Sequence, residues 1–368
     1  MKIDDKTSHN SPSIRFPEFT GEWENTTLEE CVDFLDGQRK PIKSDDRKGE
    51  KRLYPYYGAS GIIDYIDEYI FDGDYILLSE DGANIIDRNY RVAFIANGKI
   101  WVNNHAHVLQ PHKEMNINFL SEALERINYA IYNTGTTMPK LNQEICRKIN
   151  LNVPSLSEQN KIGNLLYLLN ERIATQNRLI EKLQSLIGGI AQHCIKEAIS
   201  GSMGIKLGDI CKITTGKLDA NAQVDNGLYP FFTCAEQPFK IDNFAFDTEA
   251  LLISGNGANL GYVNYYNGKF NAYQRTYVLD AFSENIQYIK WALKVLLPKR
   301  IAIEKSSSNT PYIVLSTLSD LRLPIPSKGN QCHMAELMQS LERKLSNQIA
   351  LKSSYNMLKQ YLLRQMFI

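Results

Sequence analysis

The chain of 368 residues contains an internal repeat, and this limits its fold more than any other feature. TTLEECVDFLDG, ending at Gly37, matches IKLGDICKITTG, ending at Gly216. LLSEDGAN, ending at Asn84, matches LISGNGAN, ending at Asn259, at a shift of about 175 residues. NNHAHVL pairs in the same way with YQRTYVL, and INLNVPS with LRLPIPS. One ancestral unit therefore occurs twice, and we expect two domains of similar fold.

Each repeat has an N-terminal part and a C-terminal part that differ in sequence pattern. The N-terminal parts are rich in Tyr, Phe, Ile and Val with frequent Gly, Asn and Asp, a pattern typical of short strands joined by turns. They also contain segments with helical spacing. They predict compact α/β (α+β) domains. We expect an N-terminal tail at 1–19, a first domain at 20–153, a first long helix at 154–200, a second domain at 201–325 and a second long helix at 326–368.

The C-terminal parts of the repeats predict long helices that pair as an antiparallel coiled coil with pseudo-two-fold symmetry. Apolar residues recur in steps of 4 and 3, the spacing of a heptad seam. Pro154 and the pattern Ser155-x-x-Glu158 predict the start of the first helix with a capping box, and Asn330 makes the second cap weaker. The first seam runs Ile162, Leu166, Leu169, Ile173, Gln176, Ile180, Leu183, Ile187, Ile190, Cys194; the second runs Met334, Met338, Leu341, Leu345, Gln348, Leu351, Tyr355, Leu358, Leu362, Met366.

Gln176 and Gln348 occupy equivalent positions near the midpoints of the two helices. If the helices pack antiparallel, equivalent residues meet only at the symmetry axis, so we expect the two glutamines to face each other and fix the register. The alternative is that both are tolerated polar residues in an apolar seam. The residues assigned to register and partner docking are Ile173, Gln176, Ile180, Leu345, Gln348 and Leu351.

Several classes of protein do not fit the composition and motifs. Lys plus Arg and Asp plus Glu both number 41, so no overall charge attracts nucleic acid or anionic membrane. The apolar stretches are too short to span a membrane, and we expect a cytoplasmic protein whose six cysteines are free thiols. His105 and His107 lack a third ligand, and no phosphate-binding loop or methyltransferase motif is present. We expect no metal, no cofactor and no catalysis by the chain itself.

What remains is binding, and the candidates are polar side chains in turns and at matched positions. The loop 39–52 carries seven cations and three anions, which fits either a solvated loop or contacts to DNA phosphates. Arg suits guanine and Asn suits adenine, although Asn84 and Asn259 equally suit structural hydrogen bonds. The candidate DNA-binding residues are Arg39, Lys40, Lys43, Tyr57, Ser60, Asn84, His105 and Lys140 in the first repeat, and Thr233, Asn256, Asn259, Gln274, Arg275, Lys305 and Asn309 in the second.

The order of these parts resembles the specificity subunit of type I restriction-modification systems. The resemblance covers nearly the whole chain and includes the opening RFPEFTGEWE and the phrases LNVPSLSEQNKIGNLL, YQRTYVL and SSNTPY. It implies two target recognition domains that each read one half of a split site in double-stranded DNA. It also implies that the two helices set the spacer and hold two methyltransferase subunits.

The resemblance assigns the chemistry to partners. S-adenosylmethionine is expected in the methyltransferase subunits, and ATP and Mg²⁺ in the partner subunits, which include a restriction and translocation subunit. Because this chain is neutral overall, we expect firm DNA binding only in the complex. The alternative that the sequence pattern leaves open is a coiled-coil scaffold or adaptor whose duplicated domains bind proteins or glycans.

Overall fold

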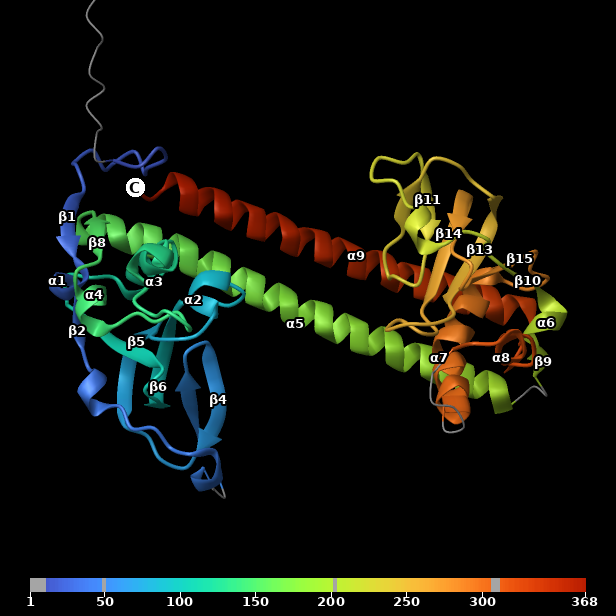
Figure 1. Ribbon diagram of the computed structural model, residues 1–368, viewed down its shortest axis with the longest axis horizontal. Helices are drawn as coiled ribbons and strands as arrows, with labels where there is room; N and C mark the ends of the chain where they lie inside the picture. Colours follow the sequence, from blue (N-terminus) through green and yellow to red (C-terminus); the bar gives the residue numbers. More distant parts are fainter. Residues whose placement is uncertain (1–10, 48–50, 201–203, 306–311) are drawn as a thin grey trace, which may run out of the picture. The chain divides into compact units, whose positions relative to one another are not determined.

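A computed structural model describes residues 11–47, 51–200, 204–305 and 312–368. The chain divides into two compact units, Met1–Asn177 with Leu351–Ile368, and Arg178–Ala350, so each unit contains one domain and part of each long helix. The two long helices are α5 (Leu156–Ser200) and α9 (Lys328–Gln365) (Figure 1).

The domain of the first unit is built on a six-stranded mixed sheet. Its order is β2-β7-β5-β6-β3-β4, in which only β3 and β6 pair in parallel. A small antiparallel sheet, β1 (Glu24–Thr27) with β8 (Asn150–Val153), joins its two ends. The sheet strands are β2 (Val32–Phe34), β3 (Tyr54–Gly58), β4 (Gly61–Ile66), β5 (Phe71–Ser79), β6 (Ala93–Val102) and β7 (Ala106–Pro111). The short helices are α1 (Leu28–Cys31), η1 (Asp36–Gln38), η2 (Ser44–Asp46), α2 (Asn84–Asp87), α3 (Ile117–Glu125), η3 (Tyr129–Tyr132) and α4 (Gln143–Arg147).

The domain of the second unit has the same topology. Its sheet order, β10-β15-β13-β14-β11-β12, corresponds strand for strand to the first, with β11 and β14 as the parallel pair. A second two-stranded sheet pairs β9 (Ile205–Lys206) with β16 (Arg322–Leu323). The sheet strands are β10 (Lys212–Thr215), β11 (Tyr229–Phe232), β12 (Phe239–Ile241), β13 (Phe246–Ser254), β14 (Val263–Ala272) and β15 (Thr276–Asp280). The helices are α6 (Leu207–Ile210), η4 (Ala220–Ala222), α7 (Ile286–Lys305) and α8 (Leu315–Ser319). The prediction of two α/β domains and two long helices is confirmed.

One helix covers each sheet, and an asparagine begins that helix in both units. Asn116 Oδ1 accepts the backbone N–H of Phe119 at the start of α3, and Asn285 Oδ1 accepts that of Tyr288 at the start of α7, both at 3.0 Å. Such N-caps satisfy an otherwise free amide of the first turn. The apolar face of each helix then packs on the middle strands to form the main core of its domain.

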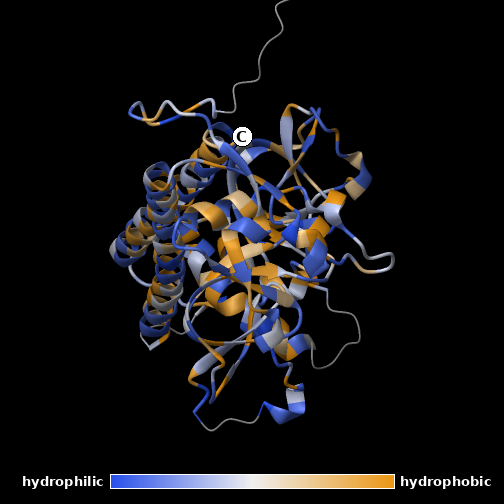
Figure 2. Cartoon of the chain, turned by 90° about the vertical axis from the view of Figure 1, so that its left-hand side faces the viewer, coloured by the Kyte–Doolittle hydropathy of each residue, from blue (hydrophilic) through white to orange (hydrophobic). Residues whose placement is uncertain are grey.

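The long helices pack antiparallel within each unit, because the start of one contacts the end of the other. In the first unit, Ile162 and Leu166 of α5 share a cluster with Leu363 of α9. In the second, Ile187 and Ile195 of α5 share a cluster with Met338 of α9. Figure 2 colours these helices mainly hydrophilic, and several of their apolar side chains, such as Leu168 and Leu186, are exposed.

The seam predicted for the last third of α9 is wrong at two positions, whereas Tyr355 and Leu362 are half-buried and Met366 is buried, as expected. Leu351 and Leu358 are 39% and 46% exposed, whereas Lys352 and Lys359 are half-buried and continue the heptad spacing from Gln348. The aliphatic stem of a lysine packs as an apolar chain while its ammonium reaches a polar partner. For Lys359 that partner is a buried carboxylate described below.

The predicted capping box of α5 is also incomplete. Ser155 Oγ accepts the backbone N–H of Glu158 at 3.4 Å, as expected. The carboxylate of Glu158 does not return to Ser155, because Arg15 donates two hydrogen bonds to it, both at 2.6 Å. A charged guanidinium is a stronger partner for a carboxylate than a single backbone amide.

Candidate nucleic-acid interface

Several of the predicted binding residues lie at one edge of each sheet, where β3 and β5, or β11 and β13, end. Equivalent backbone hydrogen bonds build the edge in both units. Glu80 N–H donates to His105 O at 2.9 Å, and Gly255 N–H donates to Arg275 O at 2.8 Å. In the first unit this bond holds the turn before β7 against the loop after β5. In the second unit it holds the turn before β15 against the loop after β13.

In the first unit this edge contains an open cavity of about 570 Å³. Three predicted residues, Ser60, Asn84 and His105, line it. His105 Nδ1 lies 2.8 Å from a carboxylate oxygen of Asp81, and half of the His105 side chain is exposed. Asp81 and Tyr90, which are not among the predicted residues, also line the cavity. Asp81 could have been found, because it occupies the position of Asn256 in the matched phrase.

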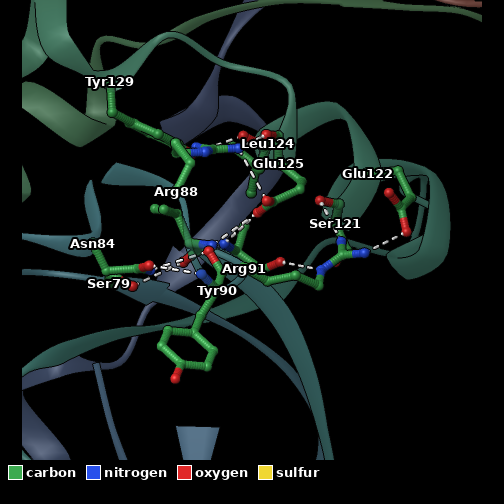
Figure 3. A network of polar contacts seen from close by, with 12 residues as sticks. Ser79, Asn84, Arg88, Tyr90, Arg91, Ser121, Glu122, Leu124, Glu125 and Tyr129 are labelled. Atoms are coloured by element: carbon green, nitrogen blue, oxygen red, sulfur yellow. Dashed lines mark hydrogen bonds and ion pairs between the residues drawn. The ribbon is translucent and has the colours of Figure 1, made fainter. Parts of the chain in front are cut away.

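Asn84 has a structural partner at this edge. Its Nδ2 donates to the carbonyl of Tyr90 at 3.1 Å, and its Oδ1 accepts the N–H of Tyr90 at 2.7 Å (Figure 3). These bonds hold the loop after α2 and leave the ring of Tyr90 exposed. Asn259 is used similarly, since its Nδ2 donates to Cys234 O at 3.0 Å. Both asparagines therefore shape the loops, which is the structural alternative considered for them.

The two edges carry different chemistry at equivalent positions. Asp81 and His105 in the first unit correspond to Asn256 and Arg275 in the second. Asn256 Oδ1 accepts from the thiol of Cys234 at 2.9 Å. Arg275 and Gln274 have exposed side chains, and within the described residues neither side chain has an ion pair. The first edge thus presents a carboxylate beside a histidine, and the second presents a free guanidinium beside an amide.

Other predicted residues have internal partners or lie away from the cavity. Arg39 Nη1 donates to Glu80 at 2.7 Å and to Ala106 O at 2.8 Å, so this guanidinium fixes the loop before β3. Lys140 Nζ lies 3.4 Å from the same Glu80 carboxylate. The carbonyl of Lys40 accepts the indole N–H of Trp101 at 2.6 Å, while its side chain is exposed.

The remaining predicted residues differ in exposure. Lys43 is exposed, Tyr57 is half-buried in β3 against Phe94, and Thr233 is buried, with its hydroxyl accepting the N–H of Ala235. Lys305 ends α7, and its side chain is not described. Asn309 lies outside the described residues.

Two features bear on other classes of function. In the described part of the chain, no group of three or more His, Cys, Asp or Glu side chains could hold a metal ion. No helix among the described residues is long and apolar enough to cross a bilayer.

The fold and these paired edges define a class of protein: two recognition domains of one topology, each mounted on a pair of long helices. A family model described as "Type I restriction modification DNA specificity domain" matches residues 20–185 and again 200–352. The chain belongs to this family of type I restriction-modification specificity subunits.

Comparison with individual proteins agrees with this family. The chain is 42% identical over 137 residues to the type I restriction enzyme EcoDI specificity subunit of Escherichia coli, covering 37% of this chain and 30% of that protein. A putative type I specificity subunit of Mycoplasma pneumoniae is 24% identical over 84% of this chain and 87% of its own length. The crystal structure of a type I S subunit from M. genitalium has the same fold, with a TM-score of 0.74 at 19% identity over 97% of this chain and 99% of that one.

Proposed function

We propose that this chain selects the DNA sequence for a type I restriction-modification complex, with each domain reading one half of a split site. The observation that carries the proposal is the repeated edge, built by equivalent backbone bonds but presenting Asp81 and His105 in one unit and Asn256 and Arg275 in the other. A shared scaffold with different polar groups suits the reading of two different half-sites, because base edges are distinguished by their donors and acceptors.

The chemistry belongs to partners in this proposal. Two methyltransferase subunits dock on the long helices and use S-adenosylmethionine, and a restriction and translocation subunit uses ATP and Mg²⁺. Because the chain is neutral overall, the partners supply much of the affinity for phosphate. The complex acts on chromosomal DNA in the cytoplasm.

The long helices set the number of unread base pairs between the half-sites. An α-helix rises ~1.5 Å per residue, and B-DNA advances ~3.4 Å per base pair. Four residues inserted after Gln176, with four more after Gln348, therefore lengthen the spacer by about two base pairs without changing either half-site.

The experiment is expression with the cognate methyltransferase subunit and mapping of methylated adenines along the genome. We expect one interrupted motif, and exchange of residues 20–153 for another recognition domain replaces one half of it. A continuous motif, or a change in both halves after the exchange, contradicts the proposal.

A further inference from the structure

A groove between the two long helices is filled by the chain itself in the first unit. Residues Ile14, Arg15 and Phe16, which lie outside helices and strands, run across the start of α5 and the end of α9. Ile14 N–H donates to Gln365 O at 2.9 Å, and the Arg15 guanidinium donates to both carboxylate oxygens of Glu158. The side chains of Ile14 and Phe16 pack on the apolar cluster between the helices.

Charged residues anchor the same segment further along. Lys161 on α5 pairs with Glu18, and its ammonium lies 5.7 Å from the ring centroids of Phe16 and Phe19. The groove in the first unit therefore accepts two apolar side chains that flank a basic one.

The internal repeat builds this groove a second time. Gln159 Nε2 donates to Pro154 O at 2.9 Å in the first unit, and Gln331 Nε2 donates to Pro326 O at 3.0 Å in the second, so the helix starts superimpose in their local contacts. The equivalent pairs that line the two grooves are Glu158 and Asn330, Lys161 and His333, Leu165 and Leu337, Phe119 and Tyr288, and Gln365 and His193.

In the second unit these residues surround an open cavity of about 580 Å³. Its lining is largely apolar and includes Tyr288 and Leu337, the latter 45% exposed. His193, Glu197 and His333 also line it, and in the described part of the chain none of these three side chains has a hydrogen bond or ion pair. No described segment occupies the place that Ile14–Phe16 take in the first unit.

We propose that this cavity is the docking site for an extended segment of a partner polypeptide. In that segment an aliphatic and an aromatic side chain flank a hydrogen-bonding residue, and a further basic residue reaches Glu197. The proposal rests on the proposed function only in naming the methyltransferase subunit as that partner. The order of side chains follows from Ile14, Arg15 and Phe16 in the equivalent groove. The cation follows from Glu197, an exposed carboxylate that lines the cavity.

The substitutions between the two grooves favour a partner over a second copy of this chain. In the first groove, Arg15 of the chain's own segment makes a bidentate contact with the carboxylate of Glu158. The second groove has the uncharged amide of Asn330 at the equivalent position. Lys161, which pairs with Glu18, is replaced by His333. The second groove therefore lacks both charges that hold the chain's own segment.

The first experiment tests whether the cavity accepts an extended segment. A labelled peptide of residues 11–19, SPSIRFPEF, is titrated against the full-length chain by fluorescence anisotropy. Asn330→Glu restores the carboxylate, so we expect it to tighten binding at least about tenfold, and an Arg-to-Gln peptide to lose that gain. Leu337→Arg abolishes the binding. Equal affinity of wild type and Asn330→Glu, or binding that Leu337→Arg leaves intact, overturns the assignment.

The second experiment identifies the occupant. Leu337→Arg is co-expressed with the cognate methyltransferase subunit, and Leu186→Arg, an equally exposed leucine of α5 outside the cavity, is the control. We expect only Leu337→Arg to reduce co-purification, by about tenfold or more, with an unchanged melting temperature. Unchanged assembly, or a shift from dimer to monomer of the isolated chain, overturns the proposal. If the wild type assembles but does not methylate a split site, the proposed function fails while the docking site stands.

Discussion

Gln159 Oε1 accepts the backbone N–H of Asn116 at 2.9 Å, and this bond helps to tie the first turn of α5 to the start of the helix that covers the sheet. Gln331 makes the equivalent bond to Asn285 at 3.0 Å in the second unit. Each domain is therefore fixed to its long helix at the residue that begins its own covering helix. A backbone group that is buried without a partner is costly, so this position tolerates few replacements.

We expect Gln159→Leu to destabilise the first unit by about 1–3 kcal/mol, because the amide of Asn116 loses its acceptor. Chemical denaturation measures the change. Gln331→Leu is the matched variant and should give a similar loss in the second unit. A loss below about 0.5 kcal/mol in both variants would show that water or a shifted side chain replaces the glutamine.

Lys359 provides a second test of how domain and helix are joined. Glu122 is 3% exposed, and its Oε1 accepts from Arg91 at 2.7 Å, Asn170 at 2.9 Å and Lys359 at 3.1 Å. Burial raises the pKa of Glu122, but Arg91 and Lys359 more than offset this and hold it below its ordinary value. Burial lowers the pKa of Lys359 in spite of Glu122.

Lys359→Met should therefore destabilise the protein by about 3 kcal/mol, since it leaves a buried carboxylate short of a cation. The double variant Lys359→Met with Glu122→Gln should recover most of the loss, which thermal unfolding can show. Lys352→Met is the control, because Lys352 lies one heptad earlier and has no ion pair within the described residues. An equal loss in Lys352→Met would assign the effect to packing of the lysine stem.

The buried pair of His107 and Asp36 predicts a pH dependence. His107 is 1% exposed, and its Nδ1 lies 2.6 Å from Asp36 Oδ2. Burial lowers the pKa of His107, but the interactions with Asp36 and Cys146 outweigh burial and raise the pKa from 6.5 to about 10. Because the folded-state pKa is the higher one, the stabilisation is complete below about pH 6.5 and is lost as the pH rises through about 10.

Melting temperatures measured from pH 6 to 10 should fall more steeply for wild type than for Asp36→Asn, which removes the partner carboxylate. His105→Asn changes an exposed pair and should retain the wild-type slope. Parallel slopes for wild type and Asp36→Asn would mean that His107 is neutral in the folded protein.

Arg275 tests whether the edge of the second unit reads DNA, as proposed. Arg275→Gln should weaken discrimination at one position of one half-site by about 1–3 kcal/mol, the value of a bidentate contact to guanine. Methylation mapping with the cognate methyltransferase subunit reports the change, and Lys212→Gln, an exposed cation of β10, is the control. Relaxed specificity in both half-sites, or none, would remove Arg275 from the interface.

The sequence by itself determined the duplication, the α/β domains and the long helices. These features depend on local periodicity and on phrases that recur along the chain, and neither requires knowledge of distant contacts. The repeat also indicated the candidate interface, because Asn84 with Asn259 and His105 with Arg275 are matched positions that the fold brings to the same edge of each sheet.

Only the tertiary structure decided which polar side chains are already used. Arg39 donates to Glu80, and Arg15 donates to Glu158, which then does not complete the cap of α5. Lys359 donates to Glu122 and lies in the seam, whereas Leu358 is exposed. Each choice depends on a partner far away in the chain, and a buried carboxylate selects a nearby cation over the local helical pattern because burying it alone costs more than exposing a leucine. Periodicity places a residue on a face of a helix, but the charge packed opposite that face decides whether the residue is buried.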